Sequence, residues 1–274
     1  AYPLPVIALA FQARLYLRTA QAGQAAECIS QALQIWPDEP RWHSLAASIQ
    51  QEAPVSADFS ETFHHLEEAV RLEPKYLAHY LAMGELMLSQ AENDPALLAR
   101  ATRLLERAAR IHSTEPEIWL QVAQLQARNN QPASLEQAAR NAEQSIQAAS
   151  ALPNHRKDVR ALLLRADLAL RQGQPKQALP FIEHAQVFDP GSAQVMLALL
   201  QVYQAMGQPA EALKMLERVI PTAIDSLPLA LRRVELLLAS GEQASAMRSL
   251  DQLVADYPHH AEVLALKAEI LAQT

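Results

Sequence analysis

Three glycines at a constant spacing constrain what this chain can fold into. Gly173, Gly207 and Gly241 follow one another at intervals of 34 residues, and an alanine stands five places after each of them. About fourteen helix-forming residues precede each glycine, and a second helical stretch follows it. A fixed period of about 34 residues with two helices in each period is the signature of a stacked helical array. The sequence therefore predicts an all-α fold built from repeated helix pairs.

The repeated segments can be compared position by position, with Val159, Ala193 and Leu227 each counted as position 1. Position 15 is then glycine, position 20 is alanine, and position 32 is proline in two of the three units. This pattern resembles tetratricopeptide repeats, a family with small residues at positions 8, 20 and 27 and larger apolar residues between them. The residues that carry the resemblance are Gly173, Ala178, Pro190, Gly207, Ala212, Gly241, Ala246 and Pro258. The resemblance implies a right-handed superhelical solenoid of about seven stacked helix-turn-helix pairs plus a C-terminal helix.

The rest of the chain divides into less regular units. Residues 1–5 are expected to form a leading segment, which Pro3 and Pro5 keep out of a helix. The expected boundaries are 6–39, 40–76, 77–115 and 116–158 for four irregular repeats, 159–192, 193–226 and 227–260 for three regular repeats, and 261–274 for a terminal helix.

The register of the first two units is less simple. In the first unit, position 20 is Ala25 in one register and Cys28 in another, in which Gly23 occupies position 15. We prefer the first register because the apolar residues that follow Ala25 also fit the pattern. In the second unit, Trp42 is assigned to position 4, where the family has a large residue.

The terminal helix carries Val263 and Ile270 at positions 3 and 10. We expect these positions to face the next helix of an array, whereas a helix that ends an array should be polar on its outer face. We therefore interpret 261–274 as the first half of a truncated repeat, and we expect self-association through this helix.

Charge and hydropathy exclude two classes of protein. The net charge is −7, and no basic stripe is present that could neutralise phosphates, so nucleic-acid binding is not expected. No apolar run is long enough to cross a bilayer and no signal-like segment is found, so no membrane insertion is expected. Cys28 alone leaves the compartment open, and a cytoplasmic location is the expectation.

No constellation of reactive residues predicts catalysis. The histidine pairs His64–His65 and His259–His260 have no Cys or carboxylate at metal-ligand spacing. Cys28 lies among small residues on a helix, without an activating charge beside it. The glycines lack any phosphate-binding pattern, and we read them as structural. The sequence therefore predicts no enzyme activity, no metal and no cofactor.

The first helix of each unit carries a second periodic pattern. Members of the resembled family bind partners in a concave groove lined by these helices. Position 5 is leucine in five successive units, and position 9 is acidic or amide in six helices. The groove candidates are Leu81, Glu85, Leu120, Gln124, Leu163, Asp167, Leu197, Gln201, Leu231, Glu235 and Glu269. They predict a protein or peptide partner with basic and apolar side chains, and the alternative is that the leucines pack between neighbouring helices.

Basic residues at position 7 are a departure from the family pattern. Arg165, Arg233 and Lys267 stand where leucine is usual, and their stems can lie on apolar surface with the charge in water. A shared binding role for them is the alternative. The resemblance as a whole implies a non-catalytic protein–protein interaction scaffold. The second hypothesis is a regulatory array within a larger enzyme, transcription regulator or secretion and assembly machine.

Overall fold

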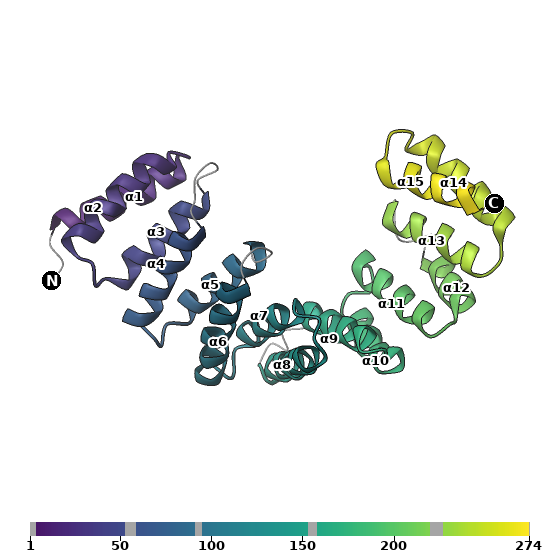
Figure 1. The fold of residues 1–274 in the computed structure, drawn as a ribbon, viewed down its shortest axis with the longest axis horizontal. Helices are drawn as coiled ribbons and strands as arrows, with labels where there is room; N and C mark the ends of the chain where they lie inside the picture. The colour runs from purple at the N-terminus through teal and green to yellow at the C-terminus, as the bar shows by residue number, and fades with distance from the viewer. Residues whose placement is uncertain (1–3, 53–58, 91–94, 153–157, 220–226, 274) are drawn as a thin grey trace. The chain divides into compact units, whose positions relative to one another are not determined.

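The chain folds into helices throughout the residues that the structure describes. The computed structural model describes residues 4–52, 59–90, 95–152, 158–219 and 227–273, and all regular structure in these ranges is α-helical (Figure 1). The first helices of the repeats are α1 (Leu4–Arg18), α3 (Pro40–Glu52), α5 (Leu77–Gln90), α7 (Pro116–Ala127), α9 (Val159–Arg171), α11 (Ala193–Ala205), α13 (Leu227–Ala239) and α15 (Ala261–Gln273). The second helices are α2 (Ala22–Ile35), α4 (Phe59–Leu72), α6 (Pro95–Ile111), α8 (Pro132–Ala151), α10 (Pro175–Phe188), α12 (Pro209–Val219) and α14 (Gln243–Asp256). The prediction of an all-α helical-repeat fold is confirmed.

Two compact units make up the chain. Unit 1 comprises Ala1–Asn130 with Gln147–Leu152, and unit 2 comprises Gln131–Ile146 with Pro153–Thr274. Within each unit, helices that follow one another pack together, as α1 does with α2 and α9 with α10. Among the described helices, none combines the length and the apolar character that crossing a bilayer requires.

The turn between the two helices of a regular repeat depends on a left-handed residue. Gly173, Gly207 and Gly241 have φ values of +71°, +73° and +80°. The residue after each glycine donates its backbone N–H to the carbonyl five residues earlier, which satisfies a carbonyl at the end of the first helix. These bonds run from Gln174 to Ala169 (2.8 Å), from Gln208 to Tyr203 (2.9 Å) and from Glu242 to Leu237 (2.8 Å).

The first repeat makes the same turn without a glycine. Ala20 has a φ of +56°, and Gln21 donates its N–H to the carbonyl of Tyr16 over 2.8 Å. Ala20 therefore occupies position 15. Gly23 lies inside α2, and Ala25 is fully buried. The register with Ala25 at position 20 is confirmed, and the competing register with Gly23 in the turn is wrong.

In three repeats of unit 1, a side chain at position 4 joins the first helix to the turn before it. In two repeats, an aromatic side chain donates a hydrogen bond to the carbonyl six residues earlier: Tyr80 Oη to Pro74 O (3.0 Å) and Trp119 Nε1 to Ser113 O (3.0 Å). In the second repeat, His43 Nε2 makes this contact with Pro37 O over 2.8 Å. His43 therefore occupies position 4, and the assignment of Trp42 to that position is wrong by one residue. Trp42 instead packs backward into the core between α1 and α2.

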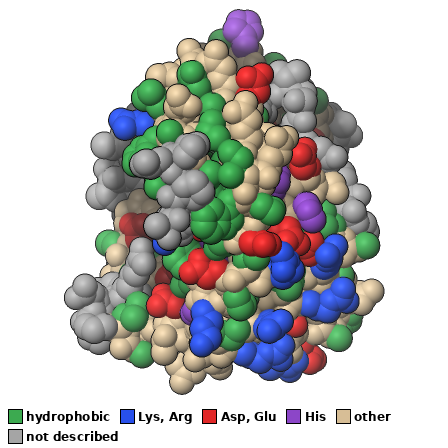
Figure 2. All heavy atoms as spheres, turned by 90° about the vertical axis from the view of Figure 1, so that its left-hand side faces the viewer, with side chains coloured by type: hydrophobic (Ala, Val, Ile, Leu, Met, Phe, Trp, Pro, Cys, Tyr) green, Lys and Arg blue, Asp and Glu red, His purple; other side chains and the backbone are tan. Residues whose placement is uncertain are grey.

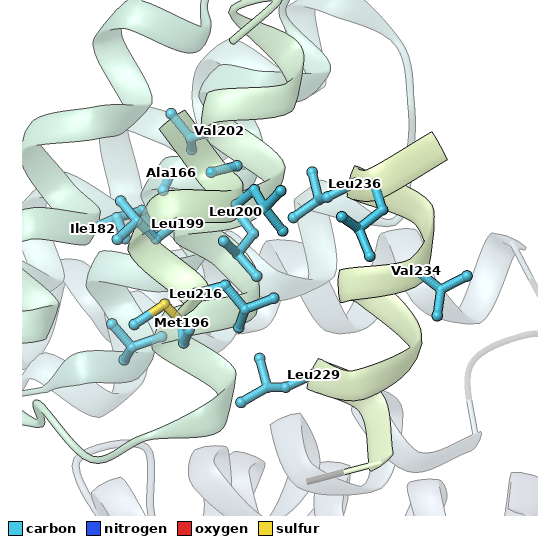
Figure 3. Packing of buried hydrophobic residues seen from close by; sticks show 14 of the residues in the cluster. Ala166, Ile182, Met196, Leu199, Leu200, Val202, Leu216, Leu229, Val234 and Leu236 are labelled. Atoms are coloured by element: carbon cyan, nitrogen blue, oxygen red, sulfur yellow. The ribbon is translucent and has the colours of Figure 1, made fainter. Parts of the chain in front are cut away.

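Positions 3 and 10 of the first helices form the core between repeats. In unit 2, Val195 and Leu229 lie in one continuous apolar cluster, and Figure 3 shows Leu236 of α13 directed toward Leu200 of α11. Position 10 thus faces the preceding pair, because α13 follows α11 in the stack. The interior is made of apolar side chains that neighbouring pairs share.

The expectation that Val263 and Ile270 face outward from the terminal helix is wrong for this reason. Val263 and Ile270 of α15 are 0% and 4% exposed, and both belong to the apolar cluster of unit 2. They face the preceding pair rather than the solvent, so they give no support to self-association or to a truncated repeat. Among the side chains of α15 whose burial the structure describes, the large apolar one that is exposed is Leu264.

The start of the chain differs from the expected leading segment. Helix α1 begins at Leu4, so Pro5 lies in its first turn, where a missing N–H leaves no helical hydrogen bond unmade. Residues 1–3 lie outside the described residues. Phe11 and Leu15 of α1 are 67% and 61% exposed. Figure 2, which faces this end of the molecule, shows hydrophobic side chains gathered on its surface with lysines and arginines below them.

The small residues of the regular repeats lie where helices cross. Ala178, Ala212 and Ala246 are each fully buried, near the start of the second helix of their repeat. A larger side chain there would push two backbones apart. Pro190 and Pro258 are exposed and stand two residues beyond the ends of α10 and α14, where they cannot continue the helix.

Candidate partner-binding groove

The groove leucines of unit 2 are only partly available to a partner. Leu163, Leu197 and Leu231 stand at position 5 of α9, α11 and α13, and each is half-buried. One side of each leucine packs against the core of the unit, and the remainder is exposed. The alternative reading, that these leucines pack between neighbouring helices, is therefore correct for part of each side chain.

The acids beside these leucines have partners on their own helices. Asp167 Oδ2 lies 2.8 Å from Arg171 Nε on α9, and Glu235 pairs with Arg232 on α13. Exposed pairs of this kind contribute little to stability, but each arginine offsets the charge of its carboxylate. Gln201 and Glu269 are exposed on α11 and α15. The acidic line that the sequence suggests is thus partly neutralised.

The groove candidates of unit 1 divide into accessible and inaccessible side chains. Leu81 and Gln124 are half-buried, and Glu85 is exposed. Leu120 is 0% exposed, because α7 is buried around most of its circumference. The prediction that Leu120 lines a groove is wrong, since its side chain reaches no solvent.

A close contact between α5 and α7 was missed by sequence reasoning. Gln121 Nε2 donates to the carbonyl of Leu81 over 3.2 Å. The Gln121 amide lies against Gly84, where an added Cβ would overlap its oxygen. Arg128 donates to the carbonyls of Met87 (3.3 Å) and of the next residue, at the C-terminal end of α5. The available signal was the glutamine Gln121 between the apolar residues Leu120 and Val122 of α7.

The basic residues at position 7 are engaged within unit 2. The Arg165 guanidinium lies 4.8 Å from the centre of the Phe181 ring, and its Nε lies 3.6 Å from Glu143 Oε2. Lys267 Nζ lies 3.1 Å from Asp251 Oδ1. The two ion pairs join a first helix to the second helix of the preceding repeat, and the contact with Phe181 lies within one repeat. The shared binding role considered for Arg165, Arg233 and Lys267 stays a prediction.

Within the described ranges, no three His, Cys, Asp or Glu side chains are grouped as a metal site needs. The rings of His64 and His65 on α4 have centroids 6.2 Å apart, and His65 Nδ1 lies 3.1 Å from His43 Nδ1 on α3. Cys28 is a free, half-buried thiol on α2.

The comparisons with known proteins agree with this geometry. A model of the tetratricopeptide repeat family matches residues 169–226, which contain α10, α11 and α12. The chain carries tetratricopeptide repeats and folds as a tetratricopeptide repeat protein. No curated protein matches the sequence.

Several solved structures share the tetratricopeptide repeat fold with this chain. A tetratricopeptide repeat protein from Parabacteroides merdae is 16% identical, with a TM-score of 0.64, and the match covers 96% of this chain and 99% of that one. PilF of Pseudomonas aeruginosa is 15% identical, with a TM-score of 0.57 and coverage of 84% and 97%. YrrB, described as a tetratricopeptide repeat protein with an unusual peptide-binding site, is 16% identical, with a TM-score of 0.53 and coverage of 74% and 97%. At these identities the likeness shows the fold alone.

Proposed function

We propose that this chain is a non-catalytic scaffold that holds a segment of a partner protein against its first helices. The observation that carries the proposal is the row of half-exposed leucines on α9, α11 and α13, which pack side by side in unit 2. Neighbouring packed helices are about 8–10 Å apart, so the row offers apolar contacts at a regular spacing. The peptide-binding site named for YrrB supports the proposal by analogy of fold only.

Apolar contacts supply the affinity in this proposal, and charges set the orientation. Because Asp167 and Glu235 already pair with arginines, a basic partner has to compete with those arginines. Charged groups at the edge of an interface mainly change the association rate and its salt dependence. The partner is therefore defined first by its apolar residues and second by its basic ones.

A pair of double variants tests the proposal on the partner that the intact chain captures. Leu163→Ser with Leu197→Ser should weaken binding of that partner about tenfold or more at every salt concentration, since burying each leucine is worth about 1.5–3 kcal/mol. The matched control is Val187→Ser, which removes an exposed apolar side chain from the second helix α10. Equal affinities for the double variant, the control and the parent chain would show that the partner binds elsewhere.

The charge contribution is tested separately. Asp167→Lys with Glu235→Lys should lower the association rate of a basic partner at low salt and have little effect at high salt, where charges are screened. An effect of the same size at both ionic strengths would contradict an orienting role for these acids.

A further inference from the structure

A hollow on unit 1 lies away from the proposed groove. It has a volume of about 580 Å³ and lies between the second helices α2 and α4, with Ala46 and Ile49 of α3 as its floor. Ile29 and Leu33 of α2 add to its apolar lining. Sites for small ligands or for inserted side chains have volumes of about 300–1,000 Å³, so the hollow is large enough for a long side chain and its neighbours.

A chain of hydrogen bonds fixes the imidazole at the edge of this hollow. His43 Nε2 lies 2.8 Å from the carbonyl of Pro37, which can only accept, so Nε2 carries the hydrogen. The Nδ1 of a neutral His43 is then bare. His65 Nδ1, 3.1 Å away, must donate to it. Neutral His65 therefore carries its hydrogen on Nδ1, and its Nε2, which has no hydrogen, is a hydrogen-bond acceptor.

His65 stays neutral under ordinary conditions. Burial, followed by the charges of His43 and His64, lowers the pKa of His65 from 6.5 to about 4. Its Nε2 therefore remains an acceptor throughout the physiological pH range.

Two other polar side chains at the hollow, Glu61 and Gln50, also present acceptor oxygens. Glu61 stands one helical turn before His65 on α4 and lines the same space with an exposed carboxylate. Gln50 Oε1 is buried and finds no hydrogen-bond partner in the described part of the chain. No lysine or arginine is among the described residues that line the hollow. A donor of positive charge on an apolar stem would complement this surface, because it would pair with Glu61 and cover the floor.

We propose that the hollow between α2 and α4 binds a lysine or arginine side chain, set in an apolar stretch of a partner protein. The cationic head donates to the Glu61 carboxylate and to His65 Nε2, and the stem lies on Ala46 and Ile49. This surface is separate from the row of leucines, which lies on unit 2. Binding here is therefore independent of the function proposed above.

The first test uses n-hexylamine as the probe and 1-hexanol as its neutral counterpart, with the intact chain labelled for NMR. At pH 7, the ¹⁵N shifts of His65 should show a hydrogen on Nδ1 and none on Nε2. Hexylamine should bind saturably, move the His65 and Glu61 signals, and bind at least about fivefold more tightly than hexanol. Equal binding of both probes, no binding of either, or a hydrogen on His65 Nε2 would overturn the proposal.

Variants on the exposed surface locate the site without threatening the fold. Glu61→Gln should weaken hexylamine binding about fivefold or more, whereas Glu27→Gln and His64→Gln, both outside the hollow, should leave it unchanged. Ala26→Leu should fill the hollow and abolish binding, with Gln24→Leu on the same helix as its control. A loss of binding in the controls equal to that in the hollow variants would refute the site.

A peptide arm distinguishes a partner protein from a free amine. A peptide with one lysine between leucines should compete with hexylamine for the hollow, and the same peptide with norleucine in place of lysine should compete at least about fivefold less well. Competition by neither peptide would show that the hollow takes a small amine rather than a protein. The variant Leu163→Ser with Leu197→Ser should bind hexylamine as the parent does, which separates this result from the test of the groove.

Discussion

Replacing Ala20 by glycine should stabilise the chain, whereas an Ala→Gly change inside a helix usually destabilises a protein. Ala20 adopts a φ of +56°, which costs an L-residue other than glycine about 1–2 kcal/mol. Glycine removes that strain. It also gives the unfolded chain more conformational freedom, which cancels about 0.5–1 kcal/mol of the gain in stability. Ala20→Gly should therefore stabilise the chain by about 0.5–1 kcal/mol.

The reverse substitution should have the reverse effect. Gly207 has a φ of +73°, and a Cβ added there would meet no atom within 4 Å. Gly207→Ala thus introduces backbone strain without a steric clash, and it should destabilise by about 1 kcal/mol. Gly23→Ala is the control, because Gly23 lies within α2 with open space around it. It should stabilise by up to about 1 kcal/mol through helix propensity alone.

Two measurements decide between strain and propensity. Denaturant unfolding gives the free energy for each variant, and amide exchange of Gln21 reports on the turn itself through its bond to Tyr16. Exchange at Gln21 should slow in Ala20→Gly. If Ala20→Gly instead destabilises by the amount typical of an Ala→Gly change inside a helix, the left-handed turn at Ala20 is refuted.

Three further predictions concern packing and titration. Gly84→Ala should destabilise the chain by about 1–3 kcal/mol because the added Cβ overlaps the Gln121 amide. In a double-mutant cycle, Gln121→Ala should remove most of the destabilisation that Gly84→Ala causes, and additive effects of the two substitutions would contradict the contact. Ala212→Leu should destabilise by about 1–3 kcal/mol at a fully buried crossing, whereas Gln208→Leu in the exposed turn should change the unfolding free energy little; equal effects would refute the register. The folded-state pKa of His65, about 4, lies below its unfolded value of 6.5, so the unfolded chain binds the proton at a higher pH than the folded chain does. The free energy of unfolding should therefore fall as the pH falls from 6.5 to about 4. An unchanged pH profile in His65→Gln would contradict this.

Local chemistry explains which parts of the fold the sequence could predict. A glycine at position 15 is visible because few other residues adopt a positive φ, and the three regular repeats follow from it. Ala20 makes the same turn with backbone strain, and an alanine in the sequence does not indicate a positive φ. The register of the second repeat was misread because Trp42 resembles the aromatic residues of position 4, while His43 makes their hydrogen bond.

The candidate groove could be predicted only as a set of positions. The sequence places leucines and acids at the right helical spacing, but exposure depends on the neighbouring helices. Leu120 is enclosed because α7 is buried on nearly all sides, whereas Leu163 keeps an exposed part. The pairing of Asp167 with Arg171 depends on side-chain conformations that spacing alone does not determine.

The link between α5 and α7 has a consequence for how unit 1 responds to force, heat or a ligand. In a linear array, each repeat is coupled only to its neighbours, and the strength of that coupling determines where the array breaks. Gln121 of α7 and Arg128, which follows α7, both donate to carbonyls of α5, so opening α5 would take these bonds away and leave the buried Gln121 amide unsatisfied. The third and fourth repeats should therefore open together. A ligand that protects one of these two repeats from unfolding would, for the same reason, protect the other.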